Sequence, residues 1–371
     1  MQTPDQRLRG PLVRLTVIPG WVVVTAATLL FAAGFSLPLE YQFVPLVASI
    51  VVFGLPHGAV DHLAPTRVCG TPVTPRSLLA VGVLYGVVGG LYAASWFVTP
   101  VAAFALFILI TWLHWGQGEI HALTALLGVD HLTGPGQRLL AALARGTLPM
   151  LVPLVFFPEQ YRFVVETVVG LFGAWIGGPA AAVFTESGRL VVAALVAVLL
   201  VATLSLGLYR AEQRRDWVVD AGEILLLVSF FAMVPPILAI GLFFTWWHAL
   251  RHVGRLLALD PEACRRLDAG RYGRTLGRFA RDAAPLTAAS LLFLGLFYVL
   301  VPVRPGGISE WTGLYLVLIA ALTLPHVLIV AYLDHVQDVW TGHPVALLDQ
   351  RRNEARNPFS SQEDTQELPR S

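Results

Sequence analysis

Ten histidines occur in this sequence, and five of them stand inside long apolar stretches. They are His57 in Gly-Leu-Pro-His-Gly-Ala, His114 in Trp-Leu-His-Trp-Gly, the pair His248 and His252, and His326 in Leu-Pro-His. An ionisable side chain inside a membrane-spanning helix is costly and indicates a functional role. Imidazole nitrogens suit iron, copper or zinc better than magnesium or calcium. The pattern therefore predicts a metal site among apolar helices.

The pair His248 and His252 is the most specific part of this pattern. Residues four apart lie on one face of a helix with Cβ atoms about 6 Å apart, close enough to bind one ion. We expect His57 and His114 at a similar depth, because the apolar stretches that carry them run in the same direction. These four residues are the candidate metal-binding and catalytic set. Hydrogen bonding between helices, or a proton path, remains open as an alternative.

The remaining histidines carry less information. His326 has a suitable depth, but a fifth ligand would take space from substrate or oxygen, so its role stays open. His62 is five residues after His57 and is therefore turned away from it. Interfacial solvation accounts for the four that fall at helix ends or in loops, namely His121, His131, His335 and His343.

Carboxylates accompany two of the histidine motifs. Asp61 and Glu119 follow His57 and His114 within about one helical turn. A metal-bound imidazole usually donates its other N–H to an outer acceptor, so Asp61, Glu119 and His326 are candidates for supporting the ligands. Ion pairing of the two carboxylates with nearby arginines is an equally weighted alternative.

Aromatic residues crowd the same motifs. At the proposed metal depth they are expected to line an apolar substrate tunnel, although tryptophan in membrane proteins more often marks the interface. The candidates are Phe53, Trp112, Trp115, Phe243, Trp246 and Trp247.

The composition requires a membrane as the solvent. Of the 371 residues, 56% are hydrophobic and 13% are charged, and the mean hydropathy is +0.68. A net charge of +1 gives no indication of nucleic-acid binding. All basic residues are arginine, so no lysine amine can hold retinal as a Schiff base. Two cysteines, Cys69 and Cys264, disfavour a disulfide framework or a thiolate metal site.

Ten apolar stretches are long enough to span a bilayer, which needs roughly 20 residues. This predicts an all-α, multi-pass protein of the cell membrane, surrounded by lipid. The arginines then gather on one side when both termini are cytoplasmic. The short stretch 161–177 is interpreted as re-entrant or interfacial. The predicted spans are 13–35, 41–64, 78–98, 101–122, 138–157, 189–209, 217–233, 236–257, 284–303 and 311–334.

No second soluble domain or repeat stands out. Residues 1–352 are predicted to form a single membrane-embedded catalytic domain. Residues 353–371 are polar and nearly free of aromatics, so they are predicted to be a disordered tail.

The four histidine motifs, with Asp61, resemble those of the Brp/Blh family of microbial β-carotene 15,15′-dioxygenases from about residue 41 to 335. The resemblance implies a non-haem Fe(II) enzyme that uses O₂ to split the central double bond of β-carotene into two all-trans-retinal, supplying a retinal-binding rhodopsin. It implies iron ligands at His57, His114, His248 and His252. Where other members have Phe and Asp, this chain has Trp115 and Glu119, which preserves the aromatic and acidic character.

Three other functions use similar residues. A membrane di-iron desaturase or hydroxylase needs more ligands, carried near the aqueous face. A histidine-lined ion or proton transporter predicts histidines spread through the membrane depth. A pigment-binding scaffold without turnover is the third. The histidines are expected at one shared depth in the membrane, which favours the oxygenase over a transporter.

Overall fold

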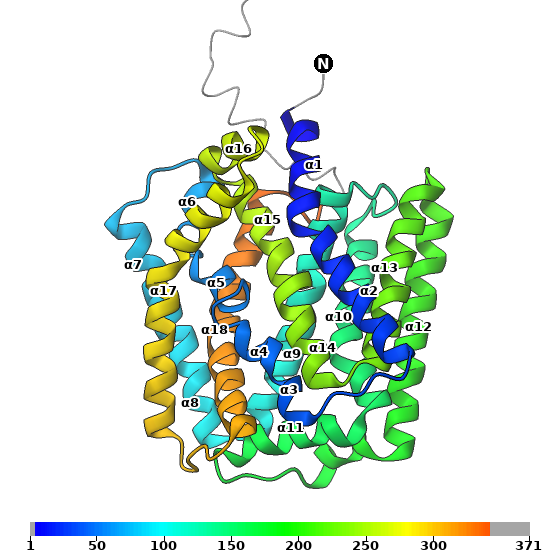
Figure 1. Ribbon diagram of the computed structural model, residues 1–371, viewed down its shortest axis with the longest axis vertical. Helices are drawn as coiled ribbons and strands as arrows, with labels where there is room; N and C mark the ends of the chain where they lie inside the picture. The colour runs from blue at the N-terminus through cyan, green and yellow to red at the C-terminus, as the bar shows by residue number, and fades with distance from the viewer. Residues whose placement is uncertain (1–3, 342–371) are drawn as a thin grey trace, which may run out of the picture.

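The computed structural model describes residues 4–341, with side chains from Arg7 onward, and every regular element in this range is a helix (Figure 1). The first half contains α1 (Pro4–Thr16), α2 (Ile18–Ala32), α3 (Leu39–Gln42), α4 (Val44–Ala48), α5 (Gly54–Ala59), α6 (Ala64–Cys69), α7 (Pro75–Leu84), η1 (Tyr85–Gly89), α8 (Gly90–Val98), α9 (Pro100–His121), η2 (Ala122–Leu127), α10 (Pro135–Phe156) and α11 (Pro158–Gly170).

The second half contains η3 (Gly178–Phe184), α12 (Glu186–Arg210), α13 (Arg214–Met233), α14 (Pro236–Leu242), η4 (Phe243–Ala249), α15 (Leu250–Ala258), α16 (Pro261–Asp268), α17 (Tyr272–Leu300) and α18 (Ile308–Val336). The predicted tail 353–371 and His343 lie outside the described residues.

Seven helices in the described part are long and apolar enough to cross a membrane. Large apolar side chains on their outer faces are exposed, as at Val198 of α12 and Leu292 of α17. A contiguous apolar surface of this kind requires lipid around it. The chain is therefore a membrane protein that is all-helical over residues 4–341. The seven helical stretches are Arg7–Ala32, Pro75–Val98, Pro100–Leu127, Pro135–Phe156, Glu186–Arg210, Tyr272–Leu300 and Ile308–Val336.

The other three predicted spans have a more irregular structure. The stretch 41–64 is broken into short helices α3 to α6, because prolines and glycines interrupt it. The stretch 217–233 lies in α13, which is 20 residues long but buries Asp220 and Glu223. The stretch 236–257 is one helical run, α14–η4–α15, with a π-helical middle and two buried arginines.

The stretch 161–177 does not form a long helix. Its helix α11 has 13 residues, which at 1.5 Å per residue is short of the roughly 30 Å hydrocarbon thickness. In Figure 1, α11 lies crosswise beneath the upright helices.

The elements that carry the histidine motifs pack directly against one another. Helix α9 contacts α18 and η4, while α5 contacts η4, α15 and α18. Helix α17 covers α5 and α18 from the outside. Segments far apart in the sequence therefore meet in the middle of the bundle. Cys69 is exposed at the end of α6, and Cys264 is half-buried in α16.

Candidate metal centre

His57 lies in the short helix α5, where the chain is locally strained. Phe53, just before this helix, has a φ of 50°, which non-glycine residues rarely adopt. A Cβ on Gly54 would lie 2.5 Å from Cβ of Ser49, so only glycine fits there. The ring of His57 is held by a hydrogen bond between Nδ1 and the carbonyl of Gly54. The Gly-Leu-Pro-His motif thus makes a tight bend that buries one imidazole.

His114 and the pair His248 and His252 come from longer helical segments. His114 is buried in α9. His248 is near the end of the π-helical turn η4, and His252 follows in α15. A π turn shifts the direction of later side chains and is frequent at functional sites.

His326 of α18 is the fifth buried imidazole of this region. Its Nδ1 donates a hydrogen bond to Oδ2 of Asp61 over 2.7 Å. The hydroxyl of Tyr85 donates to the same carboxylate oxygen over 2.5 Å. Asp61 therefore supports His326, and it comes from the loop after the helix that carries His57.

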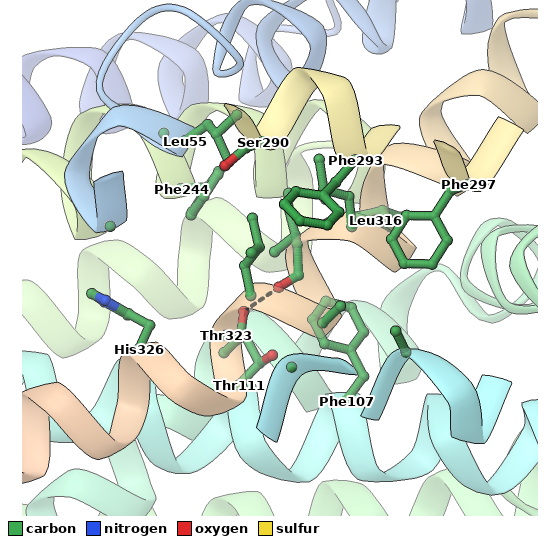
Figure 2. Close-up of a pocket in the computed structure, with 18 of the residues that line it drawn as sticks. Leu55, Phe107, Thr111, Phe244, Ser290, Phe293, Phe297, Leu316, Thr323 and His326 are labelled. Atoms are coloured by element: carbon green, nitrogen blue, oxygen red, sulfur yellow. Dashed lines mark hydrogen bonds between the residues drawn. The ribbon is translucent and has the colours of Figure 1, made fainter. Parts of the chain in front are cut away.

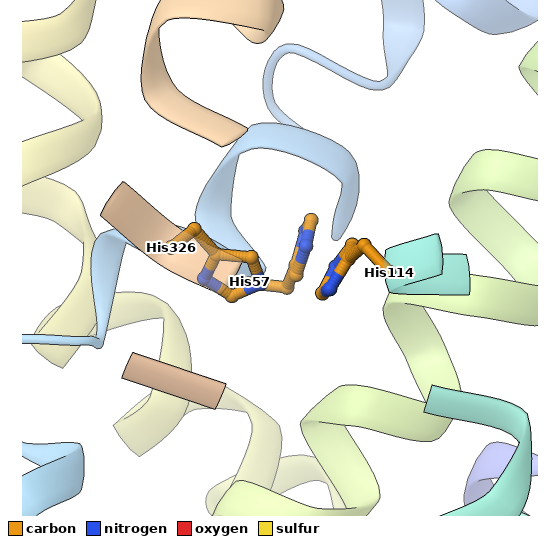
Figure 3. A group of neighbouring side chains, drawn as sticks. All are labelled: His57, His114 and His326. Atoms are coloured by element: carbon orange, nitrogen blue, oxygen red, sulfur yellow. The ribbon is translucent and has the colours of Figure 1, made fainter. Parts of the chain in front are cut away.

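The five imidazoles form one cluster. The ring centre of His57 lies 5.5 Å from that of His248, 5.6 Å from His252 and 5.0 Å from His326. The ring of His114 lies 4.9 Å from both His248 and His326. Figure 3 shows His57, His114 and His326 converging from three separate segments. The structure thus brings all four predicted ligands together, with His326 among them.

The cluster is suited to a metal ion. The nitrogens of His57, His114 and His326 lie within 4.8 Å of one another. Bonds of about 2.0–2.1 Å to one ion require nitrogens no more than about 4.2 Å apart, so small side-chain shifts suffice. The Nε2 atoms of His248, His252 and His326 are buried without a hydrogen-bond partner. Buried polar atoms are normally satisfied, and a soft divalent ion would satisfy these.

Glu119 lies in a different environment from Asp61. Its carboxylate is bound by the guanidinium groups of Arg145 and Arg251 and by the indole N–H of Trp247. Among the described residues, none of its hydrogen bonds goes to a histidine ring. Glu119 therefore pairs with arginines, whereas Asp61 hydrogen-bonds His326, which is not one of the four predicted ligands.

A large apolar cavity of about 960 Å³ borders the histidine cluster. This volume is at the upper end of the range for small-molecule sites. Figure 2 shows its aromatic and aliphatic side chains in front of His326, with the hydroxyls of Thr111 and Ser290 among them. His57, His114, His248 and His326 reach its wall.

Of the six aromatic residues predicted to line a tunnel, Trp115 is in the cavity wall. Phe53, Trp112, Phe243, Trp246 and Trp247 are not among the residues lining this cavity in the described part of the chain. The indole N–H of Trp112 donates to the carbonyl of Leu143 on α10, and Trp247 lies under the guanidinium of Arg251. Adjacent aromatics on a helix point to different faces, so only some can face one cavity.

Sequence reasoning missed the contribution of α17 to this wall. The lining positions recur every three or four residues, as one helix face should. The opposite face of α17 is equally apolar because it faces lipid, so the sequence shows no contrast between them. The lining residues of α17 are Pro285, Leu286, Ala289, Ser290, Phe293, Leu296, Phe297 and Leu300.

Sequence reasoning also missed Tyr85, whose hydroxyl donates a hydrogen bond to Asp61.

Comparison with known proteins gives a consistent assignment. The family model described as Beta-carotene 15,15'-dioxygenase matches residues 48–334. The probable beta-carotene 15,15'-dioxygenase Blh of Halobacterium salinarum is 47% identical over 334 residues, covering 90% of this chain and 96% of that protein. The probable beta-carotene 15,15'-dioxygenase Brp of the same species is 31% identical, covering 84% and 88%.

A beta-carotene 15,15'-dioxygenase of an uncultured marine bacterium is 22% identical over 166 residues, covering 36% of this chain and 60% of that protein. No solved structure matches. On the family match and the full-length relatives, this chain belongs to the beta-carotene 15,15'-dioxygenase family of carotenoid-cleaving enzymes.

Proposed function

We propose that this chain uses O₂ to cleave the 15,15′ double bond of β-carotene into two molecules of all-trans-retinal. The carbon–carbon double bond breaks, and each of the two carbons gains one oxygen atom as an aldehyde. The observation that carries the proposal is the position of the buried histidine cluster at the wall of a large apolar cavity. The names of the relatives agree with this reaction.

In this proposal, His57, His114, His248 and His252 hold a non-haem iron(II). Bound iron(II) would supply the activation of O₂, which does not attack an alkene by itself. The histidines contribute neutral nitrogen donors, and their burial excludes water from the reacting atoms. The double bond that lies beside the histidine cluster would therefore be the one that reacts.

The cavity is proposed to bind the hydrocarbon by apolar contact. Its wall consists mainly of apolar residues, with leucine and phenylalanine the most frequent, which favours a ligand without polar groups. The histidines lie at the wall, so the long axis of the polyene would pass beside them. Position along this axis, and not hydrogen bonding, would determine the site of cleavage.

The substrate would enter from the lipid. Phe97 of α8 and Phe293 and Leu300 of α17 line the cavity and are exposed side chains. A side chain with both properties stands at an opening in the wall. Because β-carotene dissolves in the bilayer, an opening at this level avoids transfer through water.

The proposal also includes ten membrane crossings with cytoplasmic termini, in the cell membrane. Helix α13 and the run α14–η4–α15 would supply two crossings, and α3 to α6 a broken third. Helices α1 and α16 lie at the same end of the bundle (Figure 1). Both carry arginines, which supports a cytoplasmic location of that end. The retinal produced would then be available to a rhodopsin in the same membrane.

Expression in cells that make β-carotene tests the reaction. We expect loss of orange colour and the appearance of retinal in extracts separated by chromatography. His248→Ala should abolish retinal formation, whereas His335→Ala, an exposed position in the last turn of α18, should not. Retinal formation by the His248→Ala variant would remove this residue from the ligand set. Two irons per purified chain would favour a di-iron oxygenase instead.

A further inference from the structure

The four histidines of the proposed ligand set share their space with His326. Its ring centre lies 5.0 Å from His57, 4.9 Å from His114 and 5.1 Å from His252. His57, His114 and His326 are the only three histidines in the described part of the chain whose ligand atoms all fall within 4.8 Å of one another (Figure 3). By position, His326 is therefore as central as any of the four.

The hydrogen bonds of His326 also leave one nitrogen available. Because the carboxylate of Asp61 accepts a hydrogen bond from Nδ1, the proton belongs on Nδ1 and the lone pair on Nε2. The Nε2 atom is buried and has no hydrogen-bond partner. An imidazole that donates one N–H to a carboxylate and keeps the other nitrogen free is the usual arrangement of a metal ligand.

Asp61 is itself held in place. Tyr85 donates to the carboxylate oxygen that accepts from His326, which leaves that oxygen with two donors. Asp61 is 1% exposed, so its negative charge is not screened by water. Neutral histidines leave the charge of a divalent ion uncompensated, and the carboxylate of Asp61 would offset it through its hydrogen bond with His326.

We propose that His326 is a fifth nitrogen ligand of the metal through Nε2, and that Asp61 and Tyr85 are the residues that position it. This inference rests on the metal centre of the proposed function. Five protein nitrogens leave one position of a six-coordinate ion for an external ligand, where four would leave two. The chain would thereby restrict what can bind beside the substrate.

Metal binding by the purified protein, independent of cleavage, tests the proposal. The probe is Co(II), because its visible spectrum reports the coordination number. For His326→Ala we expect at least a tenfold loss of Co(II) affinity, measured against a competing chelator, and a changed spectrum. His335→Ala, on the same helix, should match the wild type in both. An unchanged affinity and spectrum in His326→Ala would overturn the proposal.

Two more variants make the test independent of folding defects. Asp61→Asn keeps the shape of the side chain and should lower the affinity by about 10- to 100-fold, whereas Tyr85→Phe should lower it less. In His326→Gly, added imidazole should restore the wild-type spectrum. If His326→Ala cannot be purified, wild-type affinity in Asp61→Asn would count against the proposal. Absence of Co(II) and Fe(II) binding by the wild type would contradict the metal centre itself, and not only the role of His326.

Discussion

Glu119 of α9 and Arg145 of α10 form an ion pair of 2.6 Å that is almost completely buried. Arg145 also binds Asp220 at 2.6 Å and Glu223 at 2.9 Å, both on α13. Arg251 of α15, like Arg145, pairs with both Glu119 and Glu223. This network joins the helices that carry His114 and His252. It therefore fixes the spacing of His114 and His252.

Loss of Arg145 should destabilise the protein severely. Arg145→Met would leave Glu119 and Glu223 paired with Arg251 and Asp220 paired with His131, and breaking a buried ion pair costs about 3–5 kcal/mol. Thermal unfolding in detergent measures the effect. The matched control is Arg162→Met, which removes an exposed pair with Glu166 and should cost about 0–1 kcal/mol. Equal melting temperatures for the two variants would contradict this account.

Gly116 permits the close contact between α9 and α10. A Cβ at this position would overlap the carbonyl oxygen of Ala142, so Gly116→Ala must separate the two helices. We expect a loss of about 1–3 kcal/mol in unfolding free energy and a weaker metal site, because His114 is two residues away. Gly222→Ala in α13 has open space around it and should be neutral or stabilising by up to about 1 kcal/mol. A stable Gly116→Ala protein with normal metal content would be inconsistent with this packing.

Bound metal should stabilise the fold, because the cluster contains buried nitrogens without partners. A ligand present at 100 times its Kd adds about 2.7 kcal/mol to the unfolding free energy. We expect a chelator to lower the melting temperature and abolish cleavage, and Fe(II) to restore both. A variant with His57→Ala and His114→Ala together should show no melting shift with Fe(II). A shift of wild-type size in that variant would place the metal elsewhere.

Filling the cavity should impair carotene cleavage without changing metal binding. Ala289 of α17 lines the cavity, so Ala289→Trp places an indole in the space proposed for the polyene. We expect kcat/KM to fall at least about tenfold, which corresponds to about 1.4 kcal/mol. Ala288→Trp, the neighbouring residue on the exposed face, is the control and should retain activity. Equal activity in both would mean that the substrate does not use this cavity.

Asp260 lies at the end of the bundle that holds α16, and its ion pairs make the unfolding free energy depend on pH. Burial alone would raise the pKa of Asp260, but the hydrogen bond from Arg278 and the charge of Arg67 outweigh it and hold the pKa below its ordinary value. A carboxylate of this kind stabilises the fold above its unfolded pKa of about 3.9, and the contribution is lost as the pH falls through the lower folded value.

Asp260→Asn should therefore lower the unfolding free energy at pH 7 by on the order of 1 kcal/mol. Asparagine can still cap α16, where the Asp260 side chain accepts the backbone N–H of Glu262, so the difference reports the ion pairs. Melting temperatures between pH 7 and pH 3 measure it. The gap between variant and wild type should narrow towards the acid end, and a constant gap would argue against the ion pairs as its cause.

The membrane helices and the histidine motifs of this protein could be predicted from local sequence. Seven of the ten predicted spans form helices long and apolar enough to cross a membrane, because hydrophobicity along one segment is a local property. The histidine motifs and their resemblance to a dioxygenase family were also visible in the sequence, and the family is confirmed. That the apolar helices would need lipid around them follows from composition alone.

Which faces of these helices meet was decided by the tertiary structure. His326 joins the cluster because Asp61, 265 residues earlier, accepts its hydrogen bond. Glu119 turns to Arg145 and Arg251, although its spacing after His114 suited a ligand's partner equally well. In an apolar helix every face looks alike in sequence, since lipid and protein interior select the same side chains. Contacts between distant segments, and not periodicity, therefore determine which residues share the site.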